Sequence, residues 1–262
     1  KYTENTLLGS QTEELMAEEW ARLPSALDVA GQDGGRLPPS RAKRKRQQVQ
    51  NMYHFLKPFL RPGTRVVDFC SGCGHQSLPV AFFARDCHFT LIDFKEKSLS
   101  IARDRAKAAA LDNVTFIQGR IEDFSSPFDV GIALHACGEA SDIALEKCVE
   151  AGAAYVLVPC CVGKTKLSSR YSYPRSKAAK AGISSEAYRY ISRAADFGHG
   201  GYDGEDSRHG VEIIESRRLC KAVVEMDRNA WAMEHGYRVE LSMLHPATCT
   251  PKNDVLLGAP GQ

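Results

Sequence analysis

From residue 64 to the end of the chain, short apolar runs alternate with longer amphipathic stretches. The apolar runs predict seven strands, at 65–69, 89–92, 114–117, 130–134, 155–158, 238–244 and 255–258. The stretches between them predict helices at 76–84, 96–110, 142–151, 186–195 and 217–236. Strands separated in this way by helices are typical of a mostly parallel sheet covered on both faces. We therefore expect an α/β fold whose last two strands form an antiparallel hairpin at the edge of the sheet.

The first 40 residues carry a different pattern, an acidic amphipathic stretch that is followed by a loop rich in glycine and proline. We expect a helical extension and a loop at 1–40 and a single domain at 41–262. The chain begins with Lys1 and has no apolar signal region near its start, which predicts a fragment of a longer protein. No run of about 18 apolar residues occurs, so we expect no membrane span.

A basic run joins these two parts, because five of the six residues in Arg41–Arg46 are cationic. The run leads into a helical apolar spacing formed by Val49, Met52, Tyr53 and Leu56. Cations in the first turn of a helix oppose its dipole at a cost of ~0.3 kcal/mol or more each, which a bound anion would offset. Three interpretations stay open: a solvated turn, a nuclear localisation signal, and a surface that binds RNA phosphates.

Residues 162–212 form a long segment rich in Ser, Tyr, Lys and Gly, which we expect to be partly loop. Long loops in compact domains are often lids or binding loops. Cations give salt-dependent affinity for phosphates, and aromatic rings can stack on unpaired bases. Both kinds of side chain are scattered through the segment, at Lys164, Lys166, Arg170, Tyr171, Tyr173, Arg175, Lys177, Tyr188, Arg189 and Tyr190. The segment is thus a second candidate for RNA binding, and an ordinary solvated loop is the alternative.

A glycine loop follows the first predicted strand and leads into a helix. Its glycines would let a ligand lie against the backbone, and the helix N-terminus offers unpaired N–H groups. A dinucleotide site would have a third glycine where Ser77 stands, and the acid Asp68 in the strand would repel a pyrophosphate. Asp68 suits instead the cationic methionine part of S-adenosylmethionine (SAM). Asp93, at the end of the second strand, stands where a ribose-binding acid belongs.

The sequence therefore predicts SAM as cofactor and S-adenosylhomocysteine as product; a tight turn without a ligand is the alternative. The residues expected to bind it are Asp68, Cys70, Ser71, Gly72, Cys73, Gly74, His75, Asp93, Phe94, Ile121, Glu122, Leu134 and His135. After the third strand stands Arg120, which cannot accept a hydrogen bond from the adenine amino group. We expect the backbone of Ile121 or the side chain of Glu122 to accept it.

Cysteines follow the fourth and fifth predicted strands, at Cys137 and at Cys160 and Cys161. Ligands of open α/β sheets bind beyond the carboxyl ends of the strands, so these residues face the expected methyl acceptor. They could be small apolar fillers. Alternatively, Cys160 or Cys161 could add covalently to a pyrimidine ring, as in RNA cytosine-5 methyltransferases, provided that its pKa is lowered.

Zinc is a third interpretation of the same cysteines, with His135 as a further ligand. Adjacent cysteines are geometrically poor zinc ligands, and no spaced Cys-x-x-Cys pair supports them here. We therefore predict no metal site. His135 is instead the expected general base for direct, in-line methyl transfer, with Cys160 and Cys161 as the covalent alternative. A buried histidine that merely caps the strand end is the other interpretation.

Several motifs together resemble a known group of methyltransferases. They are RAKRKRQQVQNMYHFLKPFL, VVDFCSGCGHQSLPVA, LHACGEASDIALEKC, VPCCVG and CTPKNDVLLGAP. Over roughly residues 38–260 they resemble the methyltransferase domain of glutathione S-transferase C-terminal domain-containing proteins. The resemblance to methyltransferase-like 25 proteins and to tRNA 2′-O-methyltransferases of the Trm13 group is looser. Taken together, these resemblances imply a Rossmann-like seven-stranded SAM-dependent methyltransferase fold and suggest RNA as the substrate.

The leading functional hypothesis is therefore a SAM-dependent methyltransferase acting on RNA, with tRNA favoured. A small-molecule methyltransferase and a SAM-fold binding subunit without catalysis are the alternatives. Nine cysteines in 262 residues do not indicate a disulfide scaffold, because such scaffolds belong to small secreted domains. We expect a reducing compartment, the cytoplasm, with the nucleus as an alternative. The net charge of +2 does not by itself demand a nucleic acid.

Overall fold

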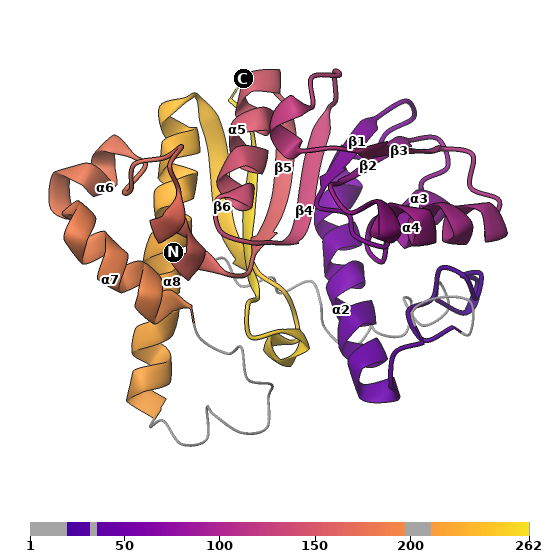
Figure 1. The fold of residues 1–262 in the computed structure, drawn as a ribbon, viewed down its shortest axis with the longest axis horizontal. Coiled ribbons are helices and arrows are strands. Elements are labelled where there is room, and N and C mark those ends of the chain that lie inside the picture. Colours follow the sequence, from indigo (N-terminus) through magenta and orange to yellow (C-terminus); the bar gives the residue numbers. More distant parts are fainter. Residues whose placement is uncertain (1–19, 32–35, 197–210, 262) are drawn as a thin grey trace.

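A seven-stranded sheet forms the centre of the computed structural model, which describes residues 20–31, 36–196 and 211–261. The strands lie in the order β3-β2-β1-β4-β5-β7-β6 (Figure 1). They are β1 (Arg65–Phe69), β2 (His88–Asp93), β3 (Val114–Gln118), β4 (Val130–Ala136), β5 (Ala154–Pro159), β6 (Tyr237–Met243) and β7 (Asp254–Pro260). Strands β1 to β5 are parallel, and β7 is antiparallel to both β5 and β6. The predicted α/β fold and its terminal hairpin are confirmed.

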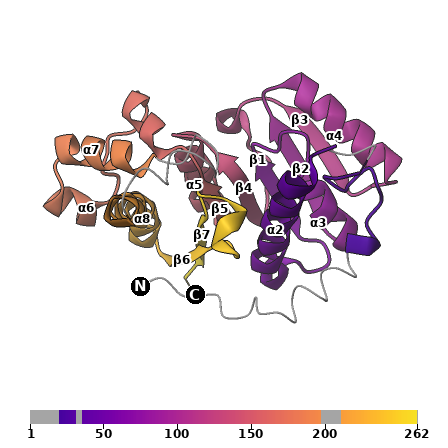
Figure 2. The same ribbon diagram turned by 90° about the horizontal axis from the view of Figure 1, so that it is seen from below.

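Helices cover both faces of this sheet. They are α2 (Pro39–Leu56), α3 (Ser77–Phe83), α4 (Glu96–Ala108), α5 (Ala140–Ala151) and α8 (Val211–Glu234). Neighbouring residues of β1 point to opposite faces: Val66 packs in the core formed with α2, α3 and α4, whereas Val67 packs in the core formed with α5 and α8. Figure 2 shows α2 and α8 on opposite sides of the sheet. Because both faces are buried, the strands are apolar throughout.

Helix α2 carries the apolar face that the sequence predicts. Val49, Met52 and Leu56 are buried, and Tyr53 packs partly buried against the same core. The helix begins at Pro39, which needs no N–H partner in the first turn. Since no acidic residue lies in that turn, the basic run Arg41–Arg46 is not offset within the helix itself.

The segment after β5 is more helical than expected. It forms η3 (Val162–Leu167), α6 (Lys177–Gly182) and α7 (Ser185–Ala195). Helix α6 was missed, although Ser176 marks its start: the Ser176 hydroxyl oxygen accepts a hydrogen bond from the N–H of Ala179 at 3.0 Å. Residues 197–210, the rest of this segment, and most of the predicted acidic helix before Trp20 lie outside the described residues. In the described part, no helix is long and apolar enough to cross a membrane.

Buried charges join this segment to the sheet. Asp142, fully buried at the start of α5, accepts hydrogen bonds from Arg228 at 2.8 Å and from Arg175 at 3.2 Å. Arg228 also donates to Glu225 at 2.9 Å and to the carbonyl oxygen of Gly138 at 3.2 Å. Burial opposes ionisation of Asp142, but the guanidinium of Arg228 holds the pKa of this carboxyl below its usual value. One carboxylate therefore connects α5, α8 and the segment before α6.

We expect Asp142→Ala to lower the free energy of unfolding by about 3–5 kcal/mol, because two buried guanidiniums lose the carboxylate they share and Arg228 keeps only Glu225. Urea unfolding followed by circular dichroism measures this loss. Arg103→Ala is the matched control, since it removes the half-exposed pair of Arg103 with Glu96 and should cost less than about 1 kcal/mol. Equal losses in the two variants would contradict the importance given to Asp142.

Candidate active site

The glycine loop after β1 is held against the end of β2. The N–H groups of Cys70 and Ser71 donate to the carbonyl oxygen of Ile92, at 3.1 and 3.0 Å. The N–H of Gly72 donates to the Asp93 carboxylate at 2.9 Å. Asp93 thus shapes the loop as well as standing at the place predicted for ribose binding. Its second oxygen accepts from the N–H of Lys95, also at 2.9 Å.

Asp68 lies beneath this loop with one oxygen unused. The hydroxyl of Ser77, which stands where a dinucleotide site has its third glycine, donates to one carboxylate oxygen of Asp68. The other oxygen is buried and has no partner among the described residues. Burial raises the pKa of Asp68 to about 7. A buried carboxylate oxygen without a donor fits the ammonium group of SAM.

The backbone around Gly72 leaves room for a ligand. Gly72 has a φ of +54°, and a side-chain carbon added to it would meet no atom within 4 Å. Close by, Cys70 has a φ of 115°, a backbone conformation that residues other than glycine rarely adopt. Beyond Asp93, Phe94 is 68% exposed, and its role in binding the cofactor stays a prediction.

The predicted adenine contacts lie in η2 (Ile121–Asp123). Glu122 accepts a hydrogen bond from Arg120 at 2.7 Å, and this bond holds the pKa of Glu122 below its usual value. Glu122 is therefore an ionised acceptor, and Arg120 orients it rather than blocking the site. The role of Ile121 and Glu122 in binding adenine stays a prediction.

Other predicted cofactor residues serve the shape of the site. Leu134 is buried in the core, only 8% exposed. The carbonyl oxygen of Cys73 accepts from the Arg105 guanidinium at 2.6 Å, and Arg105 also donates to the carbonyl oxygen of Ala26 at 2.8 Å. Sequence reasoning missed Arg105, which reads as an ordinary surface cation of α4. Burial lowers the pKa of His75 to about 3, so this ring is neutral.

The strands β1, β4 and β5 end at the edge of the sheet that lies toward the bottom of Figure 1, and we call it the catalytic edge because the predicted site residues follow these strands. Helix α2 reaches this edge. Gln48 is buried, donates to the carbonyl oxygen of Cys249 at 2.8 Å and lies 3.0 Å from the Nε2 atom of His135. Half-buried Lys45 lies close enough to Asp68 and His135 to affect the pKa of both. Burial lowers the pKa of Lys45 itself to about 8. Sequence reasoning missed both roles, because Lys45 reads as one cation of the basic run.

The hydrogen bonds of Gln48 define the protonation of His135. The Gln48 amide nitrogen is engaged by Cys249, so its oxygen faces His135 and the Nε2 atom of the ring carries the proton. Burial, with the cations Lys45 and Lys221, lowers the pKa of His135 to about 3 and keeps the ring neutral. The Nδ1 atom is then a lone-pair acceptor, as the predicted general base requires.

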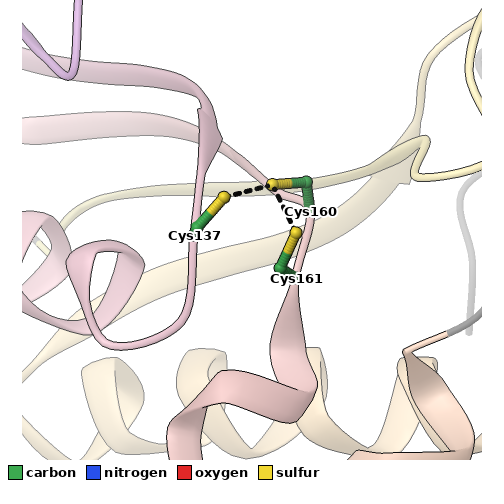
Figure 3. A group of neighbouring side chains, drawn as sticks. All are labelled: Cys137, Cys160 and Cys161. Carbon is green, nitrogen blue, oxygen red and sulfur yellow. Dashed lines mark hydrogen bonds between the residues drawn. The ribbon is translucent and has the colours of Figure 1, made fainter. Parts of the chain in front are cut away.

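The three cysteines of the strand ends lie together (Figure 3). The sulfur of Cys160 is 3.1 Å from that of Cys137 and 3.4 Å from that of Cys161. The neighbouring thiol of Cys137, together with burial, raises the pKa of Cys160, and burial raises the pKa of Cys161. The covalent alternative needs a lowered thiol pKa, which these surroundings oppose.

Comparison with known proteins agrees with this geometry. Residues 44–168 match the family model described as a methyltransferase domain. The chain contains a methyltransferase domain. The methyltransferase is 36% identical over 246 residues to the mouse (Mus musculus) glutathione S-transferase C-terminal domain-containing protein, covering 92% of this chain and 37% of that protein. The chain thus spans little more than a third of the length of such relatives.

Two further proteins are similar to this chain, one in its overall fold and one in the sequence of a part of it. The SAH-bound methyltransferase PaMTH1 of Podospora anserina has the same fold, with a TM-score of 0.54, 13% identity and 97% of each chain covered. Ribosomal RNA small subunit methyltransferase G of Cronobacter sakazakii is 37% identical over 90 residues, 34% of this chain and 42% of that protein. The methyltransferase accordingly has the Rossmann-like fold of SAM-dependent enzymes. Asp68, Gly72 and Asp93 provide a cradle that fits SAM, the predicted methyl donor.

We expect SAM to bind the methyltransferase more weakly as the pH falls below about 7, because protonation removes the negative charge of Asp68. The affinity should fall about tenfold for each pH unit below that pKa and level off above it. Calorimetric titrations across this range measure the effect. Asp68→Asn should bind weakly at every pH, and a wild-type affinity independent of pH would contradict the role of Asp68.

We also expect Gly72→Ala to weaken SAM binding, because the added methyl group enters the open space above the loop. Gly63→Ala is the matched control: Gly63 has a φ of +85° and equally open surroundings, but it lies before β1, away from the loop. Both variants should lose about 1–2 kcal/mol of stability from the left-handed backbone. Only Gly72→Ala should lose affinity for SAM, and equal affinities in the two variants would refute the placement of the cofactor.

Proposed function

We propose that this methyltransferase modifies RNA, with transfer RNA the first class to test. One observation carries the proposal: the helix that contacts His135 at the catalytic edge begins with exposed cations. Arg41 and Lys43 are exposed in the first turns of α2, and Gln48 of the same helix lies 3.0 Å from His135. The seven-residue step from Arg41 to Gln48 spans about 10 Å along a helix. A phosphate bound at the basic turn would therefore lie close to the methyl acceptor.

A groove beside the basic turn supports a nucleic-acid ligand. It has a volume of about 800 Å³ and lies between the segment before α2 and α2 itself, with Trp20, Lys43 and Arg46 in its lining. The Arg46 guanidinium lies 5.8 Å from the centre of the Trp20 ring and pairs with Asp28. An aromatic ring next to cations is a surface on which unpaired bases stack.

The segment after β5 contributes fewer cations than its sequence suggests. Arg175 is buried in its ion pair with Asp142, and Tyr188 is buried in the local core, so neither is available to RNA. Arg170 pairs with Glu146 at 2.6 Å. The exposed cations and ring of α6 and α7 are Lys177, Lys180, Arg189, Tyr190 and Arg193. These residues form the second part of the proposed RNA surface.

Direct transfer to an acceptor held beside His135 is the proposed reaction. The Nδ1 lone pair of neutral His135 would accept a hydrogen bond from the acceptor and orient it toward the SAM methyl group. A histidine whose pKa is about 3 is a weak base, so positioning contributes more than proton removal. The similarity of part of the chain to ribosomal RNA small subunit methyltransferase G also supports an RNA acceptor. We place the reaction in the cytoplasm, since none of the nine cysteines, all in the described residues, forms a disulfide.

Transfer of a labelled methyl group tests this proposal. Protein incubated with methyl-labelled SAM and total RNA should place label in RNA, and nuclease digestion with mass spectrometry identifies the nucleoside. Label in tRNA supports the proposal in full. Label only in small molecules from a cell extract would refute it in favour of the small-molecule alternative, and SAM binding without transfer to any acceptor would favour a binding subunit.

Arg41→Ala with Lys43→Ala should weaken RNA binding and lower the slope of log affinity against log salt by about 2, one for each lost phosphate contact. SAM affinity should not change. Lys57→Ala with Arg61→Ala is the control with equal charge, since both residues are exposed at the opposite end of α2, in η1 (Lys57–Phe59) and the turn after it. Equal salt slopes in the two double variants would refute the proposed surface.

A further inference from the structure

Three sulfur atoms converge beside the catalytic edge in a way that methyl transfer does not require. The side chains of Cys137, Cys160 and Cys161 point toward one another, and all three sulfurs lie within 4.8 Å of each other (Figure 3). Cys137 comes from the loop after β4, and the other two come from the chain that follows β5. Cys160 is buried, Cys161 is half-buried and Cys137 is exposed. The group therefore has a closed side and a side that faces solvent.

The local backbone explains how two adjacent cysteines face the same point. In a continuous strand, successive side chains point to opposite faces. Strand β5 ends at Pro159, and Cys161 has a φ of −111° and a ψ of 79° as the chain turns into η3. The turn brings the sulfurs of Cys160 and Cys161 to 3.4 Å. The carbonyl oxygen of Cys161 also accepts a hydrogen bond from the N–H of Gly138 at 3.0 Å, which ties this turn to the loop of Cys137.

We propose that Cys137, Cys160 and Cys161 bind one zinc ion, with the fourth coordination position open to solvent on the side of Cys137. Zn–S bonds of about 2.3 Å in a tetrahedral site place the sulfurs about 3.8 Å apart. The distances of 3.1 and 3.4 Å are close enough for small side-chain rotations to reach that spacing. Three protein ligands with one open position are typical of zinc sites that take water or a substrate group.

Charge and proton balance are consistent with zinc at this point. Binding converts three thiols into thiolates, releases three protons and leaves a net charge of −1 on the zinc and its ligands. The Lys252 ammonium lies close enough to Cys161 to interact with it electrostatically, and it also pairs with the nearby Asp196 carboxylate at 3.4 Å, so that it offsets part of the negative charge around the group. Soft thiolate ligands favour zinc over magnesium or calcium.

The zinc site would fasten the loops after β4 and β5 to each other where they border the acceptor. Cys137 lies two residues beyond His135, so the metal would restrain the loop whose backbone positions that ring. The strand pairing between β4 and β5 is irregular at this point, with a shift between Leu134 and Ala136. An additional link is useful where the strand hydrogen bonds are interrupted.

Zinc binding by the intact chain, purified without a histidine tag and kept reduced, tests the proposal. Competition with a chromophoric chelator should give about one zinc per chain. Cobalt(II) in its place should show the intense absorption of thiolate-to-cobalt charge transfer. Cys137→Ser should weaken zinc binding at least about a hundredfold, more than is typical for loss of a residue outside the ligand set. Cys160→Ser and Cys161→Ser should do the same.

Cys220→Ser is the matched control, since Cys220 is half-buried in α8 and lies outside the group. It should retain the full zinc content. Because Cys137 is exposed, we expect Cys137→Ser to keep its fold, and circular dichroism checks that any loss of zinc is not due to misfolding. No zinc binding by the reduced protein would overturn the proposal, as would a Cys137→Ser variant that binds zinc like the wild type. A disulfide in protein purified without reductant, together with no zinc binding after its reduction, would assign the group to redox chemistry instead.

Discussion

The pairing of Asp142 with two guanidiniums is the interaction on which the catalytic half of the molecule depends. Asp142 lies in the first turn of α5, just after the loop that carries Cys137, and Arg228 spans from Asp142 to the carbonyl oxygen of Gly138 in that loop. Arg175 brings the segment before α6 to the same carboxylate. Removing Asp142 takes a buried partner from both guanidiniums at once, a cost larger than the net stabilisation by the network. The loop geometry at the end of β4 is therefore inseparable from the position of α8.

A second constraint is the low polarity of the catalytic edge. Burial keeps His135 neutral and lowers the pKa of Lys45, while it raises the pKa of Asp68. Each shift favours the uncharged form of its group, because a charge is poorly solvated there. Methyl transfer from a sulfonium to a neutral acceptor spreads positive charge, and such a reaction proceeds well where water is excluded. The same surroundings favour ligands that bring their own counter-charge, as the SAM ammonium would at Asp68.

Much of the fold, and the loop geometry of the candidate cofactor site, was predictable from sequence, since both depend on local patterns. The apolar runs located all seven strands within a few residues, because burial on both faces leaves them apolar throughout. The glycine loop and Asp93 were predicted from their order along the chain, and the structure brings them into contact. Helix α6 was not predicted, although Ser176 is a typical N-cap residue, because the surrounding segment is polar and lacks an apolar helical pattern. Arg105 and Gln48 could not be predicted, since their partners lie far away in sequence.

The sequence alone determined the succession of strands and helices along the chain, the glycine loop after β1 and the residue types at the strand ends, because each rests on spacing between near neighbours. Only the tertiary structure decided how these residues act. It divided the basic run, turning Lys45 inward while Arg41 and Lys43 stay exposed. It also assembled three cysteines into one group where the sequence had argued against a metal site. The physical reason is that strand ends, helix faces and buried charges meet through long-range packing, which no local pattern encodes.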